Sequence, residues 1–135
     1  MNRKVVGQLS GENSEKIGII KISDEVIALC IVNAVLGTKG VAGFSPVFSD
    51  NFSKNFFGKD PPFKGIKISQ GDDGISADLY VIVDYGVKIP SVAWDIQENV
   101  KKEIQTMIDA PVKAINIHVQ GVRMKGEEGP LNEQN

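Results

Sequence analysis

The sequence predicts an α+β fold: a single-domain two-layer sandwich in the order β-α-β-β-β-α-β, with two helices on one face of an antiparallel or mixed sheet. Residues 75–85 alternate apolar and polar side chains, the period of two that is typical of a strand with one buried face. Residues 92–107 place apolar side chains along one stripe at helical spacing, which predicts a helix that packs one side on a sheet. Because each predicted helix links two strands, we expect the helices and the sheet to form two layers.

The size and composition of the chain predict one folded domain. The chain has 135 residues, of which 41% are hydrophobic, and this is enough for a single core. Residues 1–16 and 125–135 are polar and offer little to bury, so we expect a flexible N-terminal arm and a flexible C-terminal tail around a folded unit at 17–124. The net charge of -2, from 15 basic and 17 acidic residues, gives no reason to expect nucleic acid or an anionic membrane surface as a partner.

The cysteine content and the apolar segments indicate the cytoplasm. No apolar stretch near the N-terminus has the length of a signal peptide, and a single cysteine, Cys30, cannot form an internal disulfide. The longest apolar run, residues 26–36, is far shorter than the roughly 20 residues that cross a bilayer. We therefore expect a cytoplasmic protein with no membrane span of its own. Attachment to a membrane would require a membrane-anchoring partner protein.

The first part of the folded unit is expected to contain three strands and one helix. Residues 17–22 form a short apolar strand candidate, and Ser23 is the expected N-cap of a helix over 24–36. Strand-forming residues resume at 40–47 and again at 64–69. These elements precede the long central strand.

The second part of the folded unit contains the clearest patterns. The turn sequence QGDDG leads into the strand at 75–85, and a second helix begins at Pro90 or Ser91 and runs to about Ile108. The final strand covers 112–122. The apolar stripe of the second helix consists of Val92, Ala93, Ile96, Val100, Ile104 and Met107.

The residues that carry most enzyme chemistry are scarce in this chain. The only histidine, His118, lies on the side of its strand opposite the apolar residues, so we expect a solvated histidine without the further ligands of a zinc site. Cys30 lies in a nearly all-apolar helix and is expected to be an inert buried thiol. Asp72 and Asp73 fall in a G-D-D-G turn, where they are favoured for backbone reasons. We therefore predict that the protein is not an enzyme, with no catalytic, cofactor-binding or metal-binding residue and no cofactor.

The predicted helix at 24–36 is apolar on nearly all sides after its first turn. Two groups of apolar side chains lie on nearly opposite sides: Ile27, Ile31 and Ala34 on one, and Leu29, Val32 and Leu36 on the other. A helix that is apolar all round is buried on more than one face. The second face is therefore either packed under another segment of the chain or used as an interface, within a homo-oligomer or with a partner.

All six phenylalanines lie within residues 44–63, a stretch rich in the residues of surface turns. Phe48, Phe52 and Phe56 are four residues apart, so their rings can line one side of a short helix, with Phe57 beside them. This aromatic surface is expected to be covered, either as a lid over the first helix or as a docking surface for a partner.

Trp94 raises the same question on the second helix, because it points away from the apolar stripe. It either caps the sheet edge or anchors a partner. The predicted partner or oligomer interface comprises Leu29, Val32, Leu36, Phe48, Phe52, Phe56, Phe57 and Trp94.

A nucleic-acid hypothesis rests on one short motif. The sequence from Gly37 to Gly40, GTKG, resembles the GxxG loop with which a KH domain clamps single-stranded nucleic acid. That loop joins two helices in a KH domain, whereas here it leaves a helix and enters a strand. A helix end followed by a turn explains the motif better, and a single-stranded RNA-binding α+β module remains the alternative function. A small-molecule pocket beneath the phenylalanines is a third hypothesis.

Three stretches resemble the alkaline shock protein family of Gram-positive bacteria, also called the Gls-type general stress family. They are the I-S-x-x-V-I sequence at 22–27, the Y-G-x-x-I-P sequence at 85–90, and INIHVQGV at 115–122. The resemblance covers about residues 17–124. It implies a small, cytoplasmic, non-enzymatic protein connected with alkaline or envelope stress. Some members of the family associate with themselves and are held at the membrane by a separate anchor protein.

The chain departs from the pattern of this family in three places. The first helix is more apolar than usual, the link after the second strand is more aromatic, and the second helix ends in Ile108-Asp109-Ala110-Pro111 where a Thr-Gly turn is common. We expect Asp109 to make this turn without a glycine. The predicted function is a stress-response and envelope-homeostasis scaffold that acts by self-association and protein-partner binding.

Overall fold

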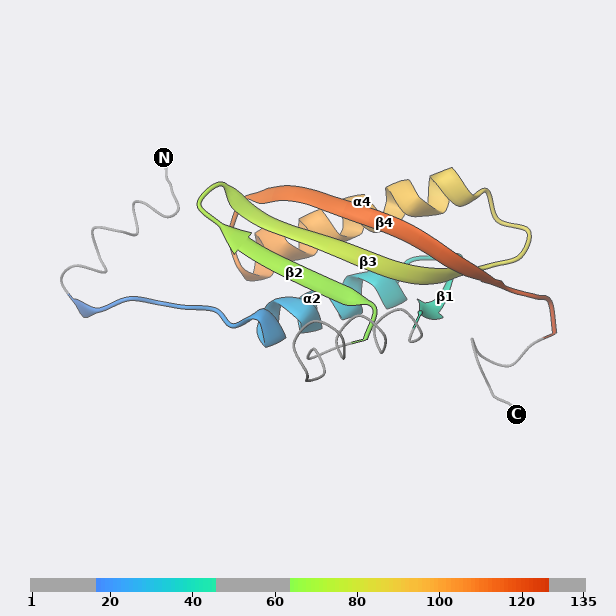
Figure 1. The fold of residues 1–135 in the computed structure, drawn as a ribbon. Coiled ribbons are helices and arrows are strands. Elements are labelled where there is room, and N and C mark those ends of the chain that lie inside the picture. The colour runs from blue at the N-terminus through green and yellow to red at the C-terminus, as the bar shows by residue number, and fades with distance from the viewer. Residues whose placement is uncertain (1–16, 46–63, 127–135) are drawn as a thin grey trace.

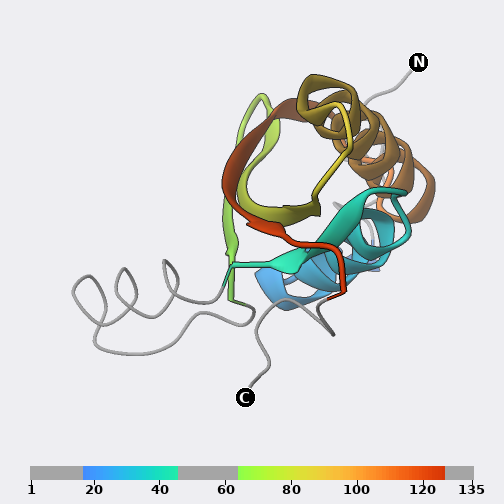
Figure 2. The same ribbon diagram turned by 90° about the vertical axis from the view of Figure 1, so that its right-hand side faces the viewer.

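The computed structural model describes residues 17–45 and 64–126, which form an α+β fold with two helices and a four-stranded sheet (Figure 1). The elements follow in the order α2 (Asp24–Leu36), β1 (Val41–Phe44), β2 (Ile66–Gly71), β3 (Gly74–Asp84), α4 (Ile89–Met107) and β4 (Val112–Arg123). Both helices contribute to one core on the same side of the sheet, so the predicted two-layer architecture is confirmed (Figure 2).

β3 is the central strand of a mixed sheet (Figure 1). β4 runs parallel to β3 along one edge, with Ile75 opposite Val112 at one end and Asp84 opposite Arg123 at the other. β2 and β1 share the other edge and are antiparallel to β3, since β2 pairs with the first half of β3 and β1 with the second. The parallel pair requires a long crossover connection, and α4 supplies it.

β1 and β2 meet beside Tyr80. The Tyr80 N–H donates to the Gly65 carbonyl at 2.8 Å, and the Tyr80 carbonyl accepts from the Ser45 N–H at 2.8 Å. Gly65 has a φ of +83°, and a Cβ atom there would lie 3.0 Å from the Tyr80 carbonyl oxygen, so this junction requires glycine. Ser45 and Gly65 are therefore both held at Tyr80 on this edge.

Alternate side chains of β3 form the centre of the core, which confirms the predicted period of two. They are Ile75, Ala77, Leu79, Val81 and Val83, and α4 covers them with Val92, Ile96, Val100 and Ile104. Two residues that were predicted to follow these patterns, Tyr85 and Met107, are exposed instead. Tyr85 follows the last residue of β3 and Met107 ends α4, so both lie beyond the covered part of their element.

The prediction of a first strand at 17–22 is wrong. These residues form no strand, and the side chains of Ile17, Ile19 and Ile20 are exposed. A strand needs a partner for its backbone hydrogen bonds, and within the described part of the chain residues 17–22 pair with none of the four strands. The Gln70 side chain holds the end of this segment, since its Nε2 donates to the Ile22 carbonyl at 3.2 Å.

The helix ends agree with the cap signals in the sequence. Ser23 is the N-cap of α2, and its Oγ accepts from the Val26 N–H at 3.3 Å. Asp109 follows the end of α4 with a φ of 61°, the left-handed conformation that glycine usually takes. The prediction that Asp109 makes this turn without a glycine is confirmed.

Candidate functional site

Helix α2 buries one side against the sheet. Ile27, Ala28, Ile31 and Val35 are at most 1% exposed and belong to the same core as the central strand. Ile27, Ile31 and Val35 are four residues apart and Ala28 lies three residues before Ile31, which places all of them on one helix face. This inner face accounts for the packing of α2.

The opposite side of α2 is apolar and exposed. Leu29 is 56% exposed, Leu36 is 55% exposed and Val26 is 46% exposed, and Asn33 lies among them, also exposed. We call these four residues the outer stripe. They follow one another at intervals of three, four and three residues, which places them on one line along the helix. The outer stripe is the candidate functional site.

The structure brings two of the predicted α2 residues together and separates the third. Leu29 and Leu36 both lie on the outer stripe, whereas Val32 is half-buried and packs against the core. Val26 belongs to the outer stripe and was missed in the sequence. Its distance of three residues from Leu29 and seven from Asn33 is the signal that would have identified it.

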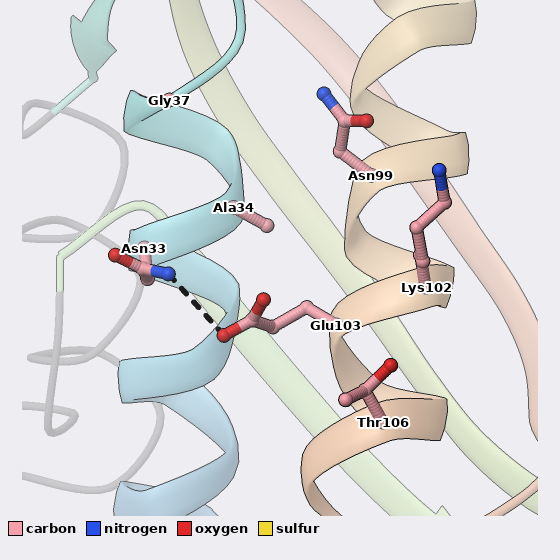
Figure 3. A pocket seen from close by; sticks show the side chains of 7 residues that line it. All are labelled: Asn33, Ala34, Gly37, Asn99, Lys102, Glu103 and Thr106. Atoms are coloured by element: carbon pink, nitrogen blue, oxygen red, sulfur yellow. Dashed lines mark hydrogen bonds between the residues drawn. The ribbon is translucent and has the colours of Figure 1, made fainter.

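A polar groove of about 390 Å³ lies between α2 and α4, beside the outer stripe (Figure 3). Asn33 Nδ2 donates to Glu103 Oε2 at 3.2 Å across the groove. Near its other end, Asn99 Nδ2 donates to Thr38 Oγ1 at 2.9 Å, and Thr38 Oγ1 donates to the Ala34 carbonyl at 2.8 Å. These hydrogen bonds link α2, and the turn that follows it, to α4 across the groove.

Cys30 is a buried thiol on α2, as predicted. Burial, and to a smaller extent the negative charge of Glu103, raise the pKa of the Cys30 thiol above its ordinary value. The thiolate is therefore disfavoured at neutral pH, which suits a structural cysteine rather than a nucleophile.

The face of the sheet that points away from the helices carries a polar network around His118. Its Nε2 lies 3.0 Å from Asp78 Oδ1, and its ring stacks on Tyr80 with the centroids 4.3 Å apart. Asn116 Nδ2 donates to the same Asp78 oxygen at 3.2 Å. Burial and the charge of Asp78 raise the pKa of the Tyr80 hydroxyl. His118 is therefore part of a cross-strand network rather than an isolated solvated side chain, and it lies on the predicted face.

The GTKG sequence forms the end of α2 and the turn into β1. Thr38 is buried. Gly40 has a φ of +97°, and a Cβ atom at this position would lie 2.9 Å from Val92 Cγ2, which is too close. Both residues are required by the packing of this turn against α4. This agrees with the expectation of a helix end followed by a turn.

The remaining predicted interface residues lie apart from the outer stripe or outside the described residues. Trp94 is 60% exposed on α4, as its sequence position indicates. Phe48, Phe52, Phe56 and Phe57 lie outside the described residues. In the described ranges no group of three or more His, Cys, Asp or Glu residues is placed to hold a metal ion, and neither helix there is long and apolar enough to cross a membrane.

Comparison with known proteins identifies the relatives of this chain. A family model for the alkaline shock protein 23 family, described as having a cell envelope-related function, matches residues 12–124. The uncharacterized protein YqhY of Bacillus subtilis is 34% identical over 120 residues, which cover 87% of this chain and 88% of that protein. A stress response regulator gls24 homolog of Streptococcus pyogenes is 22% identical over 108 residues, which cover 80% of this chain and 60% of that protein.

The likeness to solved structures is weaker. A structure of MamM-CTD overlaps 73% of this chain and 99% of its own length with 17% sequence identity and a TM-score of 0.46. At this level the likeness carries no argument about the chain.

Proposed function

This chain belongs to the alkaline shock protein 23 family, and on that premise we propose that it is a non-enzymatic scaffold of the envelope stress response that associates with itself and with a protein partner. The family has a cell envelope-related function. Relatives named as stress response regulators support the connection with stress. The observation that carries the scaffold proposal is the outer stripe of α2.

The outer stripe supports binding because its apolar side chains remain exposed. Leu29, Leu36 and Val26 lie on one line and are each about half exposed, in a helix whose other side is fully packed. Isolated exposed apolar residues need no explanation, but a contiguous set on one helix is typical of an interaction surface. Burying large apolar side chains also supplies most of the free energy of protein association.

The proposed partners are a second copy of the chain and a membrane-anchoring protein of the envelope. A scaffold needs at least two binding surfaces, and Trp94 on α4 is an exposed aromatic residue of the kind that anchors partners. The proposal places the protein in the cytoplasm, at the membrane only through its partner.

The experiment is affinity capture of the cross-linked protein from the soluble and membrane fractions of its own cells, followed by mass spectrometry. We expect the wild-type chain to recover itself and one membrane protein. The double variant Leu29→Ser/Leu36→Ser should recover less of both, whereas Met107→Ser, at a residue 65% exposed on α4, serves as the matched control.

Two results would contradict the proposal. One is the same recovery with the double variant as with the wild type. The other is nuclease-sensitive recovery of RNA-associated proteins, which would favour the alternative of a single-stranded RNA-binding module.

A further inference from the structure

We propose that the outer stripe of α2 pairs with the outer stripe of a second copy of this chain, with the two helices antiparallel. This inference rests on the self-association in the proposed function and adds the surface, the occupant and the orientation. Three features of α2 support it: the spacing of the outer stripe, the charges at the two ends of the helix, and the polar residue in the middle of the outer stripe.

The spacing of the outer stripe is that of a helix-pairing seam. The intervals of three, four and three residues from Val26 to Leu36 match the a and d positions of a coiled coil over this short span. Leu29 and Leu36 occupy equivalent positions one heptad apart, and Val26 and Asn33 do the same. Asn33 also bonds to Glu103 on α4. The three apolar side chains, Val26, Leu29 and Leu36, remain about half exposed, so the core does not account for their position on this line.

The charges at the ends of α2 select the antiparallel orientation. Asp24 and Glu25 lie in the first turn, and the last turn has no basic residue, but Lys39 follows three residues after Leu36 and is exposed. A parallel pair would bring the acidic ends together. An antiparallel pair with Leu29 opposite Leu36 of the second copy places Glu25, in the first turn of α2, beside the turn that follows α2 in that copy, and Lys39 lies in this turn.

The orientation also suits the helix dipoles. In an antiparallel pair the positive N-terminal end of one α2 lies beside the negative C-terminal end of the other, which is the favourable arrangement. Glu25 and Lys39 then form two symmetry-related charge pairs, one at each end of the seam. The second copy therefore complements the first without any change in either chain.

Asn33 lies near the middle of the seam, where the two-fold axis would pass. Figure 3 shows its amide nitrogen directed at Glu103 and its oxygen directed away from the groove, and the nitrogen donates to Glu103 Oε2 at 3.2 Å. The bond to Glu103 holds the side chain in place on the helix. A single asparagine in such a seam specifies register at a cost in affinity, because a polar group must find a partner there.

The seam is short, so the pairing is expected to be weak. α2 has 13 residues and is therefore about 20 Å long. A seam of this length buries less than the roughly 1,200 Å² that marks the lower limit of stable interfaces. We expect a concentration-dependent, transient self-association with a dissociation constant in or above the micromolar range.

The orientation is tested by disulfide trapping. In a Cys30→Ala background, Glu25→Cys and Lys39→Cys chains are prepared separately, then oxidised alone and as a mixture. Antiparallel pairing predicts cross-linked dimers in the mixture at a yield several times that of either chain alone. Efficient cross-linking of Glu25→Cys with itself would mean a parallel pair and would overturn the inference.

The charge pair is tested by reversal and rescue, with sedimentation of the full chain as the readout. Glu25→Lys and Lys39→Glu should each weaken self-association about tenfold, and the double variant should recover to within about threefold of wild type. Equal weakening in the double variant would show that the two charges do not meet.

The outcomes also separate this inference from the proposed function. If the wild type self-associates but no change at Leu29, Leu36, Glu25 or Lys39 alters the association, the α2 pairing is wrong and the scaffold proposal stands. A chain that is monomeric at every concentration and loses stability in Leu29→Ser/Leu36→Ser would mean that the chain covers its own stripe, which also overturns the pairing. If it in addition captures no envelope protein, the scaffold proposal fails with it.

Discussion

Helices α2 and α4 bury equivalent inner faces in the same core but differ in what they present outward. Most of the outward side of α4 is charged and can remain in contact with water. Its exposed charged residues are Asp95, Glu98, Lys101 and Lys102. The outward side of α2 carries Leu29 and Leu36. α4 exposes single apolar residues such as Trp94, whereas α2 exposes a line of them. Covering the sheet does not require this line, and our proposal assigns it to a contact outside the core.

The largest expected effect tests whether the inner faces are equivalent. Ile31 on α2 and Ile104 on α4 are both 0% exposed, so Ile31→Ala and Ile104→Ala should each lower the free energy of unfolding by about 2–5 kcal/mol. Urea denaturation of the two variants measures this. A loss below about 1 kcal/mol in only one of them would mean that the two helices do not share the core equally.

The next effect concerns the turn that leaves α2 and packs on α4. Gly40→Ala should destabilise the fold by about 2–4 kcal/mol, because a φ of +97° disfavours alanine and the new Cβ would meet Val92 Cγ2 at 2.9 Å. Gly86→Ala is the matched control, since Gly86 has a φ of +98° and nothing within 4 Å of a Cβ. Thermal unfolding should show a smaller loss of stability for Gly86→Ala than for Gly40→Ala. Equal losses would mean that the contact with Val92 does not contribute to the effect.

A smaller effect, of opposite sign, concerns the other helix end. Asp109 has a φ of 61° after α4, whereas Gly37 after α2 has an ordinary φ of −85°. Asp109→Gly should therefore raise the free energy of unfolding by up to about 1 kcal/mol, since glycine adopts the left-handed conformation without strain. Asp109→Ala should lower it, and a destabilised Asp109→Gly variant would mean that the Asp109 side chain contributes more than the turn conformation does.

The elements with a clear period could be predicted from the sequence. The core-facing alternation along β3 and the stripe of α4 were confirmed because each has a continuous apolar side, which packs away from water. On the other side of β3, Tyr80 and Ile82 are also buried. The bounds of α2 were also predicted, since Ser23 caps its first turn and Gly37 follows its last residue. The outward side of α2 could not be resolved in full, because an all-apolar helix has no polar face to mark the side that meets water.

Two features depend on distant parts of the chain and were beyond local patterns. The run at 17–22 has the composition of a strand, but a strand also needs a free sheet edge beside it, and composition does not report that. The parallel pairing of β4 with β3 arises from the crossover through α4. The sharing of the other edge of β3 by β1 and β2 depends on which strands meet in space. Neither leaves a signal in the residues of one strand.

Sedimentation equilibrium over a wide range of concentration tests whether the outer stripe of α2 binds a second copy of the chain. Three proteins are compared: the wild type, Leu29→Ser/Leu36→Ser and Met107→Ser. We expect the wild type and Met107→Ser to associate as the concentration rises. Leu29→Ser/Leu36→Ser should remain monomeric, with an unfolding free energy within about 1 kcal/mol of wild type. Association of the double variant equal to that of the wild type would contradict the claim that the outer stripe of α2 is an interaction surface.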